Sequence, residues 1–406
     1  MSKEVNQNTY SLEGLDLKEA LQKIYLTALD LNFPVALWRM PLQKDITLIV
    51  DLSGKSKKVK AELEELGEGF LAVPFHSKTE NTGEYISADL IFSSEDCQLK
   101  VNPLFKDSWT TELFFQRLAA NNLSEPKGLP GSTTIISEKI PETESEDYCN
   151  LVKKGIDEIN RGTFKKVVLS RTKELDLKPD FNVINSFVEL GNAYPGAFVN
   201  LFQLPGIGLW MGATPELLIS QDKDGIFKTV SLAGTQKAEP GSNPLEIGWT
   251  QKEIEEQAMV GRYIINCFKK IRLREFDENG PKTVRAANLY HLKSEYLVNT
   301  KEVNFTQLGT VMLQLLHPTS AVCGMPKEPS MEFILANENY DRSFYAGFIG
   351  PVNINNESQL FVNLRCMQIV GQKGILYAGG GITEFSNPEK EWLETEMKCR
   401  TLLDVI

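Results

Sequence analysis

Cysteine and histidine are scarce in this chain, and neither occurs at a metal-binding spacing. The 406 residues include six cysteines and three histidines, and no two cysteines are separated by only two residues. Zinc sites and disulfide frameworks need such residues in pairs or clusters. The sequence therefore predicts neither of them, and the cysteines are expected to be buried free thiols.

Long apolar runs are also missing. No stretch approaches the roughly twenty apolar residues that are needed to cross a bilayer. The first eight residues are polar and do not form the apolar core of a secretion signal. On this basis we expect a cytoplasmic protein that has no membrane partner.

Basic clusters and nucleotide-binding loops are absent from the sequence as well. The net charge is −11, and no run of Lys or Arg is interleaved with aromatic residues, which argues against a nucleic-acid partner. No Gly-x-x-x-x-Gly-Lys-Ser/Thr loop supports binding of a nucleoside triphosphate. An anionic small substrate is still allowed, because local positive groups and a metal ion can reverse the field within one cleft.

The pattern of the chain is that of a large globular protein. It is 42% hydrophobic and 24% charged, and its length permits two or three domains. Residues 124 to 147 are rich in Pro, Gly, Ser, Thr and Glu, which predicts an exposed connection that need not divide two domains. Elsewhere strand-like runs and long helical patterns favour a mixed α/β or α+β layered domain. Helices are expected at 17–31, 148–160, 248–270 and 388–402, and strands at 34–39, 45–52, 69–75, 85–92, 165–175, 197–203, 206–212 and 225–232.

A glycine-rich turn near the C-terminus precedes a charged helix. The segment Tyr-Ala-Gly-Gly-Gly-Ile at 377–382 is followed by Glu391, Glu394 and Lys398. On a helix these three side chains lie on one face, so two carboxylates and an ammonium project together beside the turn. This arrangement suits a hard cation together with an anionic ligand.

A second pair of glutamates has the same three-residue spacing. On a helix, Glu256 lines up with Val260, Tyr263 and Cys267, so its carboxylate lies in a partly apolar row and needs a partner, as does nearby Glu253. Mg²⁺ suits these residues because it prefers oxygen ligands, takes few carboxylates and leaves positions for water and substrate. The alternative is two ordinary solvated helices, since protein surfaces are rich in such pairs.

A lysine and a glutamate are candidates for acid–base chemistry. Lys166 alternates with Phe164 and Val168 on one face of a predicted strand, and a poorly solvated amine loses its proton more easily and can then accept one from water. Glu216 follows a strand and a proline turn beside Leu217, where an apolar setting raises the pKa of a carboxyl and keeps it protonated as an acid. The alternatives are a lysine that reaches solvent and a glutamate at a helix start or on the surface.

An arginine and two glycine segments are candidates for binding an anion. Arg365 shares a strand face with Phe361, and a guanidinium there needs an anion, which is either a ligand carboxylate or an acid of the protein itself. The pair Gly234-Thr235 and the glycines at 379–381 offer backbone N–H groups without obstruction by side chains. Each glycine cluster alone is a weak signal.

Taken together and in order, these segments resemble the chorismate-utilising enzymes, and most closely the isochorismate synthases. The resemblance extends from Tyr148 to the C-terminus and rests on at least seven motifs that occur in sequence. They are Lys-Val-Val-Leu-Ser-Arg at 166–171, Ala-Thr-Pro-Glu-Leu at 213–217, Leu-Ala-Gly-Thr at 232–235, Lys-Glu-Ile-x-Glu at 252–256, His-Pro-Thr-Ser-Ala-Val-Cys-Gly-Met-Pro at 317–326, Phe-Tyr-Ala-Gly-Phe-Ile-Gly at 344–350, and Gly-Gly-Gly-Ile at 379–382 with the following Glu-x-x-Glu-Thr-x-x-Lys.

The resemblance implies a fold and a domain organisation. The implied fold is an α/β (α+β) two-layer sandwich like that of anthranilate synthase component I, with large mixed or antiparallel sheets flanked by helices. Residues 1–406 would form a single chorismate-binding domain. Within it, residues 148–406 carry the motifs, and residues 1–125, which match no recognisable motif, would complete the same fold as a divergent N-terminal part.

The resemblance also implies a reaction, the reversible conversion of chorismate to isochorismate. Lys166 would activate the water that attacks C2 of chorismate, and Glu216 would protonate the hydroxyl that leaves C4. Arg365 and Tyr345 would hold the pyruvyl carboxylate, and His291 would lie near the leaving hydroxyl. Further residues implied to line the substrate pocket are Gly234, Thr235, Ala321, Leu364, Gly379, Gly381 and Lys398.

Magnesium is the implied cofactor. Glu256 and Glu394 would bind Mg²⁺ directly, and Glu253 and Glu391 would support it through water. The metal would in turn hold the ring carboxylate of the substrate and neutralise its charge. An acid, a base and paired metal carboxylates in one order make a non-catalytic, cation-dependent binding module, in which the acidic helices serve an interface, the weaker alternative.

Three residues bear on the choice within the family. Ammonia-using members, the anthranilate and aminodeoxychorismate synthases, typically lack a lysine where this chain has Lys166, and the latter usually carry a lysine where it has Ala233. Salicylate synthases go on to expel pyruvate, and several carry threonine where this chain has Ala321. The residues favour water as nucleophile and isochorismate as the end product, with salicylate synthase as the alternative. A monomer without a glutamine amidotransferase subunit is expected, and the pathway served (menaquinone, siderophore or salicylate) is left open.

Overall fold

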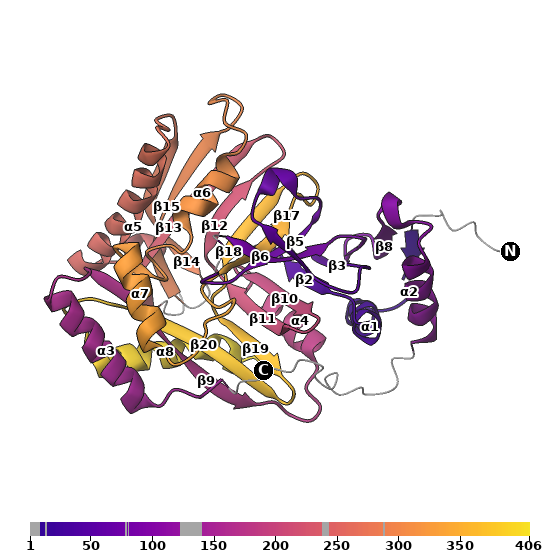
Figure 1. Cartoon of the computed structure of the whole chain (residues 1–406), viewed down its shortest axis with the longest axis horizontal. Coiled ribbons are helices and arrows are strands. Elements are labelled where there is room, and N and C mark those ends of the chain that lie inside the picture. The colour runs from indigo at the N-terminus through magenta and orange to yellow at the C-terminus, as the bar shows by residue number, and fades with distance from the viewer. Residues whose placement is uncertain are drawn as a thin grey trace.

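Two large antiparallel sheets form the body of the protein (Figure 1). The computed structural model describes residues 9–12, 14–77, 79, 81–121, 140–237, 243–286 and 289–406, so the predicted connection at 124–147 lies mostly outside the described residues. Every strand pairing in the described part of the chain is antiparallel. The predicted α+β architecture with large antiparallel sheets is confirmed.

In the described part of the chain, the first sheet has eleven strands and the second has nine. In spatial order the first contains β1 (Thr9–Ser11), β8 (Gln98–Val101), β7 (Leu90–Ser93), β3 (Ile46–Val50), β2 (Val35–Arg39), β10 (Phe198–Leu204), β11 (Gly208–Thr214), β19 (Cys366–Val370), β20 (Lys373–Ile382), β9 (Lys166–Asp176) and β16 (Gly324–Met325). The second contains β14 (Asp277–Ala286), β15 (Leu289–Asn299), β13 (Ile226–Lys237), β12 (Leu217–Gln221), β18 (Ser358–Val362), β17 (Phe348–Val352), β5 (Gly69–Val73), β6 (Thr82–Ser87) and β4 (Lys57–Lys60).

Helices cover the outer faces of the sheets (Figure 1). α5 packs on β13, α6 on β12, α8 on β20, and α1 and α4 on the first sheet. The helices are α1 (Leu17–Asp30), α2 (Trp109–Ala120), α3 (Ser145–Asn160), α4 (Val183–Ala193), α5 (Gln251–Lys270), α6 (Leu308–Leu316), α7 (Lys327–Asn337) and α8 (Pro388–Leu403), with short 3₁₀ turns at Leu63–Glu65, Pro103–Phe105 and Pro244–Glu246.

The inner faces of the two sheets share one hydrophobic core. Aromatic side chains meet across it: Phe198 of the first sheet stacks on Phe361 of the second with ring centroids 4.2 Å apart. Trp38 and Phe70 make a similar contact at 5.7 Å. Such pairs add to the free energy of burial and hold the sheets in one register. The six cysteines are free, and four of them are buried.

Strands from the N-terminal part of the chain take part in both sheets. β2 pairs with β10 in the first sheet, and β5 pairs with β17 in the second. A buried strand needs hydrogen-bond partners on both sides, so each sheet is continuous only when these early strands are in place.

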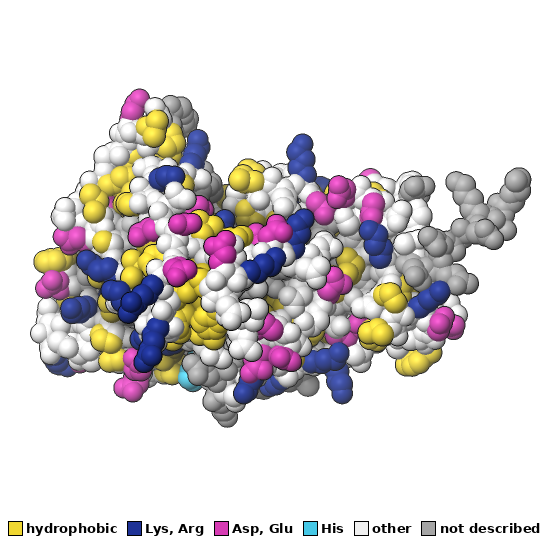
Figure 2. Space-filling model, turned by 90° about the horizontal axis from the view of Figure 1, so that it is seen from above, with side chains coloured by type: hydrophobic (Ala, Val, Ile, Leu, Met, Phe, Trp, Pro, Cys, Tyr) yellow, Lys and Arg dark blue, Asp and Glu magenta, His cyan; other side chains and the backbone are white. Residues whose placement is uncertain are grey.

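Acidic and basic side chains are interspersed over the face shown in Figure 2, as the mixed composition of the sequence leads one to expect. Among the described residues, no helix is both long enough and apolar enough to span a bilayer.

Local sequence fixes where the two helices that flank the candidate site begin. α5 starts with a capping box, in which the Thr250 side chain accepts from the Glu253 N–H and the Glu253 side chain accepts from the Thr250 N–H. α8 starts with Asn387 as N-cap and Pro388 in the first turn, where the missing N–H of proline costs nothing. The predicted helices at 248–270 and 388–402 are therefore observed with small shifts at their ends.

Candidate active site

A single cavity of about 520 Å³ collects the residues that the sequence singled out. It lies between β9, β20, α5 and α8 and is large enough for a small organic dianion. The predicted site residues that line it are Lys166, Glu216, Gly234, Glu253, Glu256, His291, Ala321, Tyr345, Leu364, Arg365, Gly379, Gly381, Glu391, Glu394 and Lys398. Thr235 lies in β13, but its side chain falls outside the described residues.

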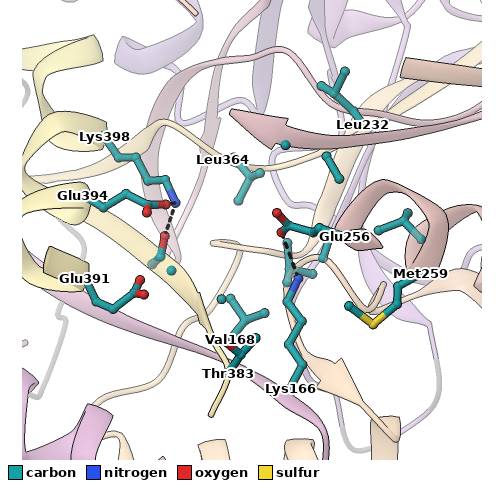
Figure 3. Close-up of a pocket in the computed structure, with 18 of the residues that line it drawn as sticks. Lys166, Val168, Leu232, Glu256, Met259, Leu364, Thr383, Glu391, Glu394 and Lys398 are labelled. Carbon is teal, nitrogen blue, oxygen red and sulfur yellow. Dashed lines mark hydrogen bonds and ion pairs between the residues drawn. The ribbon is translucent and has the colours of Figure 1, made fainter. Parts of the chain in front are cut away.

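Lys166 begins β9 and points into the cavity beside Glu256 (Figure 3). Its side chain is 9% exposed, and its Nζ lies 3.3 Å from Glu256 Oε1. The neighbouring strand β20 leaves space for this side chain because it has a glycine, Gly381, at the point of contact. A Cβ at that position would lie 2.7 Å from Lys166 Cε. The lysine is thus buried as the strand pattern predicted, and its amine has a carboxylate partner in α5.

Glu216 lies at the wall of the cavity, between β11 and β12. The short irregular link that begins at Pro215 places it there, and a register shift between Leu217 and Ile219 follows at once in the pairing with β18. Burial raises the pKa of the Glu216 carboxyl to about 7, against the opposing effect of nearby Lys166, Arg365 and Lys398. The carboxyl is therefore protonated in a large fraction of molecules at neutral pH, as an acid requires.

Arg365 supplies a cationic group on another wall. Its backbone has a positive φ of 48°, which is rare for a residue with a side chain and is the kind of strain that collects at functional sites. Among the described residues, no ion pair joins its guanidinium to a carboxylate. Burial lowers the pKa of Arg365, yet a guanidinium stays charged in proteins. Of the two alternatives from the sequence, this favours a ligand anion as its partner.

The α8 wall combines one lysine with two glutamates (Figure 3). Lys398 Nζ lies 2.7 Å from Glu394 Oε1 and donates to the Gly379 carbonyl at 2.6 Å. Glu391 is 7% exposed and accepts from Ser386 Oγ at 2.8 Å. Gly380 faces this carboxylate so closely that a Cβ would lie 3.0 Å from Glu391 Oε2. The predicted face of the helix therefore does lie against the glycine-rich strand.

The carboxylates proposed for a metal lie on opposite sides of the cavity, Glu256 on α5 and Glu394 and Glu391 on α8 (Figure 3). Among the described residues they do not form a preassembled cluster of three or more metal ligands. Mg²⁺ usually takes only one or two carboxylates and completes its shell with water and substrate oxygens. The donor set fits an ion bound together with an anionic substrate.

Glu253 has a task that the sequence analysis overlooked. Its Oε2 accepts from the Thr250 N–H at 2.8 Å and from Gln236 Nε2 at 2.9 Å. The signal was present, since Thr250-x-x-Glu253 is a capping-box sequence. That Glu253 supports the metal through water stays a prediction. The same carboxylate already caps α5.

His291 is held by the backbone of a predicted pocket residue. Its Nδ1 lies 2.9 Å from the Gly234 carbonyl, which can only accept, so the proton sits on Nδ1 and Nε2 is the acceptor nitrogen. Burial lowers the pKa of His291, so the ring is neutral at pH 7. Cavity residues that the sequence analysis did not single out include Leu232, Met259, Thr383 and Phe385, which belong to no charged motif.

Comparison with known proteins gives a consistent result. Residues 53–406 match the family model described as "Chorismate binding enzyme". The chain is 29% identical to isochorismate synthase DhbC of Bacillus subtilis, over 65% of this chain and 68% of that protein. It is 26% identical to isochorismate synthase MenF of Escherichia coli, over 69% of this chain and 65% of that protein. Each sequence match thus spans about two thirds of the relative's length.

Solved structures share the fold over nearly the whole chain. The menaquinone-specific isochorismate synthase MenF from Escherichia coli superposes with a TM-score of 0.71 at 21% identity, covering 97% of this chain and 93% of that one. Anthranilate synthase component I from Streptococcus pneumoniae gives a TM-score of 0.64 at 17% identity, covering 99% and 93%. The likeness extends to the N-terminal strands, where the sequence offered no motif.

The raised pKa of Glu216 predicts a pH-dependent contribution to stability. An acid whose pKa rises on folding stabilises the protein at low pH, and this contribution is lost as the pH rises from about 4.5 towards 7. Urea unfolding at pH 4.5, 6 and 8 should show the wild type losing stability relative to Glu216→Gln, by at most about 3 kcal/mol. Parallel pH profiles for the two proteins would rule out the raised pKa.

Proposed function

The chain belongs to the family of chorismate-binding enzymes, and we propose that it is an isochorismate synthase. The reaction exchanges the C4 hydroxyl of chorismate for a hydroxyl at C2 and is reversible. The observation that carries the proposal is the single cavity in which a buried lysine, a protonatable glutamate and an arginine with no carboxylate partner among the described residues lie together. Relatives whose names describe this activity support it.

Base and acid are assigned to Lys166 and Glu216. The Lys166 amine accepts a proton from the water that attacks C2, and the Glu216 carboxyl donates a proton to the hydroxyl that leaves C4. A carboxyl with a pKa of about 7 is suited to this task, because it is available as an acid and recovers its proton readily. His291, with a neutral ring, accepts a hydrogen bond through Nε2 near the leaving hydroxyl.

Lys166 can accept a proton only when its amine no longer binds Glu256. Their contact of 3.3 Å is long for a charge-assisted bond, and the Glu256 side chain is 39% exposed, so the carboxylate has room to turn to another partner. Glu256 is also one of the two proposed direct ligands of Mg²⁺. The two proposed roles of Glu256 are therefore compatible, because its carboxylate would leave the Lys166 amine when it turned to the metal.

Magnesium would be held by Glu256 and Glu394, with Glu253 and Glu391 supporting it through water. When bound, it neutralises the ring carboxylate of the substrate and fixes its position. Arg365 and Tyr345 bind the pyruvyl carboxylate, for which the planar fork of the guanidinium is suited. Gly379 and its glycine neighbours leave the backbone of β20 open to the ring, and Gly234, Thr235, Ala321, Leu364, Gly381 and Lys398 complete the pocket.

The choice of nucleophile and end product rests on three residues. Lys166 as base and Ala233 at the cavity wall favour water over ammonia, and Ala321 favours release of isochorismate without loss of pyruvate. Salicylate synthase is the second candidate, because it needs the same base and acid. A cytoplasmic monomer that works without an amidotransferase subunit is part of the proposal.

Lys166→Ala is expected to lower turnover of chorismate by about 10² to 10⁴-fold, because it removes the base. Purified protein is incubated with chorismate and Mg²⁺, with and without ammonium, and the products are separated by chromatography. The wild-type protein should form isochorismate both with and without ammonium. The exposed Lys154→Ala on α3 serves as control and should retain wild-type turnover.

Three outcomes would contradict the assignment of the base or the proposed reaction. Near-normal turnover by Lys166→Ala would remove this residue as base. Salicylate with pyruvate as the product would select the second candidate. An aminated product in ammonium would assign the chain to the ammonia-using enzymes.

Removal of Mg²⁺ with EDTA is expected to stop the reaction, and added Mg²⁺ should restore it. Glu394→Gln should weaken Mg²⁺ binding by roughly tenfold or more, measured by calorimetry, because it removes a charged ligand. Glu389→Gln, an exposed residue in the first turn of α8, is the matched control. Full activity after exhaustive chelation would refute the metal requirement.

Gly381→Ala is expected to lower kcat with little change in KM. Its Cβ would lie 2.7 Å from Lys166 Cε and 3.2 Å from Nζ, so the amine must move, and a shift of about 1 Å in a reacting group costs up to roughly a hundredfold in rate. Gly196→Ala, where a Cβ meets nothing within 4 Å, is the control. An unchanged kcat for Gly381→Ala would show that the position of Lys166 is not critical.

A further inference from the structure

The strand that carries Lys166 has an unusual outer edge. One edge of β9 pairs with β20 along its length, whereas on the other edge the pairing with the two-residue strand β16 ends at Val167, and the Val168 N–H bonds to the Cys323 carbonyl at 2.8 Å. The next outward-facing peptide groups are the Val168 carbonyl and the Ser170 N–H. Peptide groups at such an edge need polar partners, because a buried N–H or C=O without one destabilises the fold.

A buried ion pair fills this gap. Glu338 and Arg342 are joined by two bonds, Nη2 to Oε1 at 2.6 Å and Nε to Oε2 at 2.7 Å, and their side chains are 2% and 3% exposed. Arg342 Nη2 also donates to the Val168 carbonyl at 2.7 Å, and Glu338 Oε1 accepts from the Ser170 N–H at 2.7 Å. The pair therefore bonds to the edge of β9 as a neighbouring strand would.

The same pair reaches two other segments that line the cavity. Arg342 Nη1 donates to the Val322 carbonyl at 3.0 Å, next to Ala321, and the Arg342 carbonyl accepts from the Tyr345 N–H at 2.9 Å. The guanidinium lies 4.3 Å from the centre of the Phe75 ring. Neither Glu338 nor Arg342 lines the cavity itself.

Attraction between the two charges does not by itself explain a buried ion pair at this place. Well-packed apolar residues of similar size are often as stable as such a pair, because the charges lose hydration on burial. Apolar side chains, however, offer no bonds to the backbone of Val168, Ser170 and Val322. A fork with fixed geometry holds these groups at defined distances from each other.

We propose that Glu338 and Arg342 are a positioning pair, which replaces a missing strand at the edge of β9 and thereby sets the position of Lys166 relative to Ala321 and Tyr345. The effect on turnover rests on the proposed function, whereas the effect on the strand edge does not. The pair acts through the backbone and does not touch the substrate.

The proposal is tested with Arg342→Lys, which keeps the charge and loses the fork, and with Glu338→Gln. For both variants we expect kcat to fall at least about tenfold while KM changes less than about threefold. Hydrogen–deuterium exchange should accelerate at the Ser170 N–H, which donates to Glu338. Leu21→Ala in α1, a buried residue of the other core cluster, lowers stability at a distance and should leave kcat and this exchange unchanged.

A double variant, Glu338→Leu with Arg342→Met, separates positioning from charge balance. It leaves no unpaired charge, so its Tm should exceed that of Glu338→Gln, while its kcat should stay low and the exchange at β9 fast. Recovery of kcat together with Tm would overturn the proposal, as would normal exchange at the Ser170 N–H in both single variants. If the wild type does not convert chorismate, the proposed function fails, and the exchange measurement still decides the role of the pair.

Discussion

The antiparallel pairing of β9 with β20 is the constraint on which the candidate site depends. Its register places Gly381 opposite Val168, which gives the Lys166 side chain the space that a Cβ would fill. Because α8 follows β20 after a short turn, the same pairing brings Glu391 and Lys398 over the glycines. A slip of one residue would turn Lys166 to the other face of the sheet and dismantle the cavity.

Two of the cationic side chains that line the cavity are paired with carboxylates. Lys166 faces Glu256 and Lys398 faces Glu394, while Arg365 has no carboxylate partner among the ion pairs of the described residues. Although the net charge is −11, the wall of the cavity thus contains a cationic group that can attract an anion. The local arrangement of charges, and not the overall charge, sets the electrostatic field within the cavity.

Much of this arrangement could be predicted from the sequence, because it depends on patterns among residues that are close together in the chain. Alternation gave the strand of Lys166, helical spacing gave the shared face of Glu391 and Lys398, and the order of motifs gave the fold. What could not be predicted is contact between distant segments. The partner of Lys166 is 90 residues away, and the bonds of Glu338 and Arg342 to β9 depend on a strand that ends early. No pattern within either segment encodes such contacts.

The order of strands has a consequence for how the chain is made. In the first sheet β19 and β20, near the C-terminus, lie between β11 and β9, and in the second β17 and β18 lie between β5 and β12. During synthesis the early strands leave the ribosome long before these central neighbours exist. Neither sheet can be completed until almost the entire polypeptide has emerged, and pairing between such distant segments generally slows folding and leaves nascent strand edges exposed to other chains.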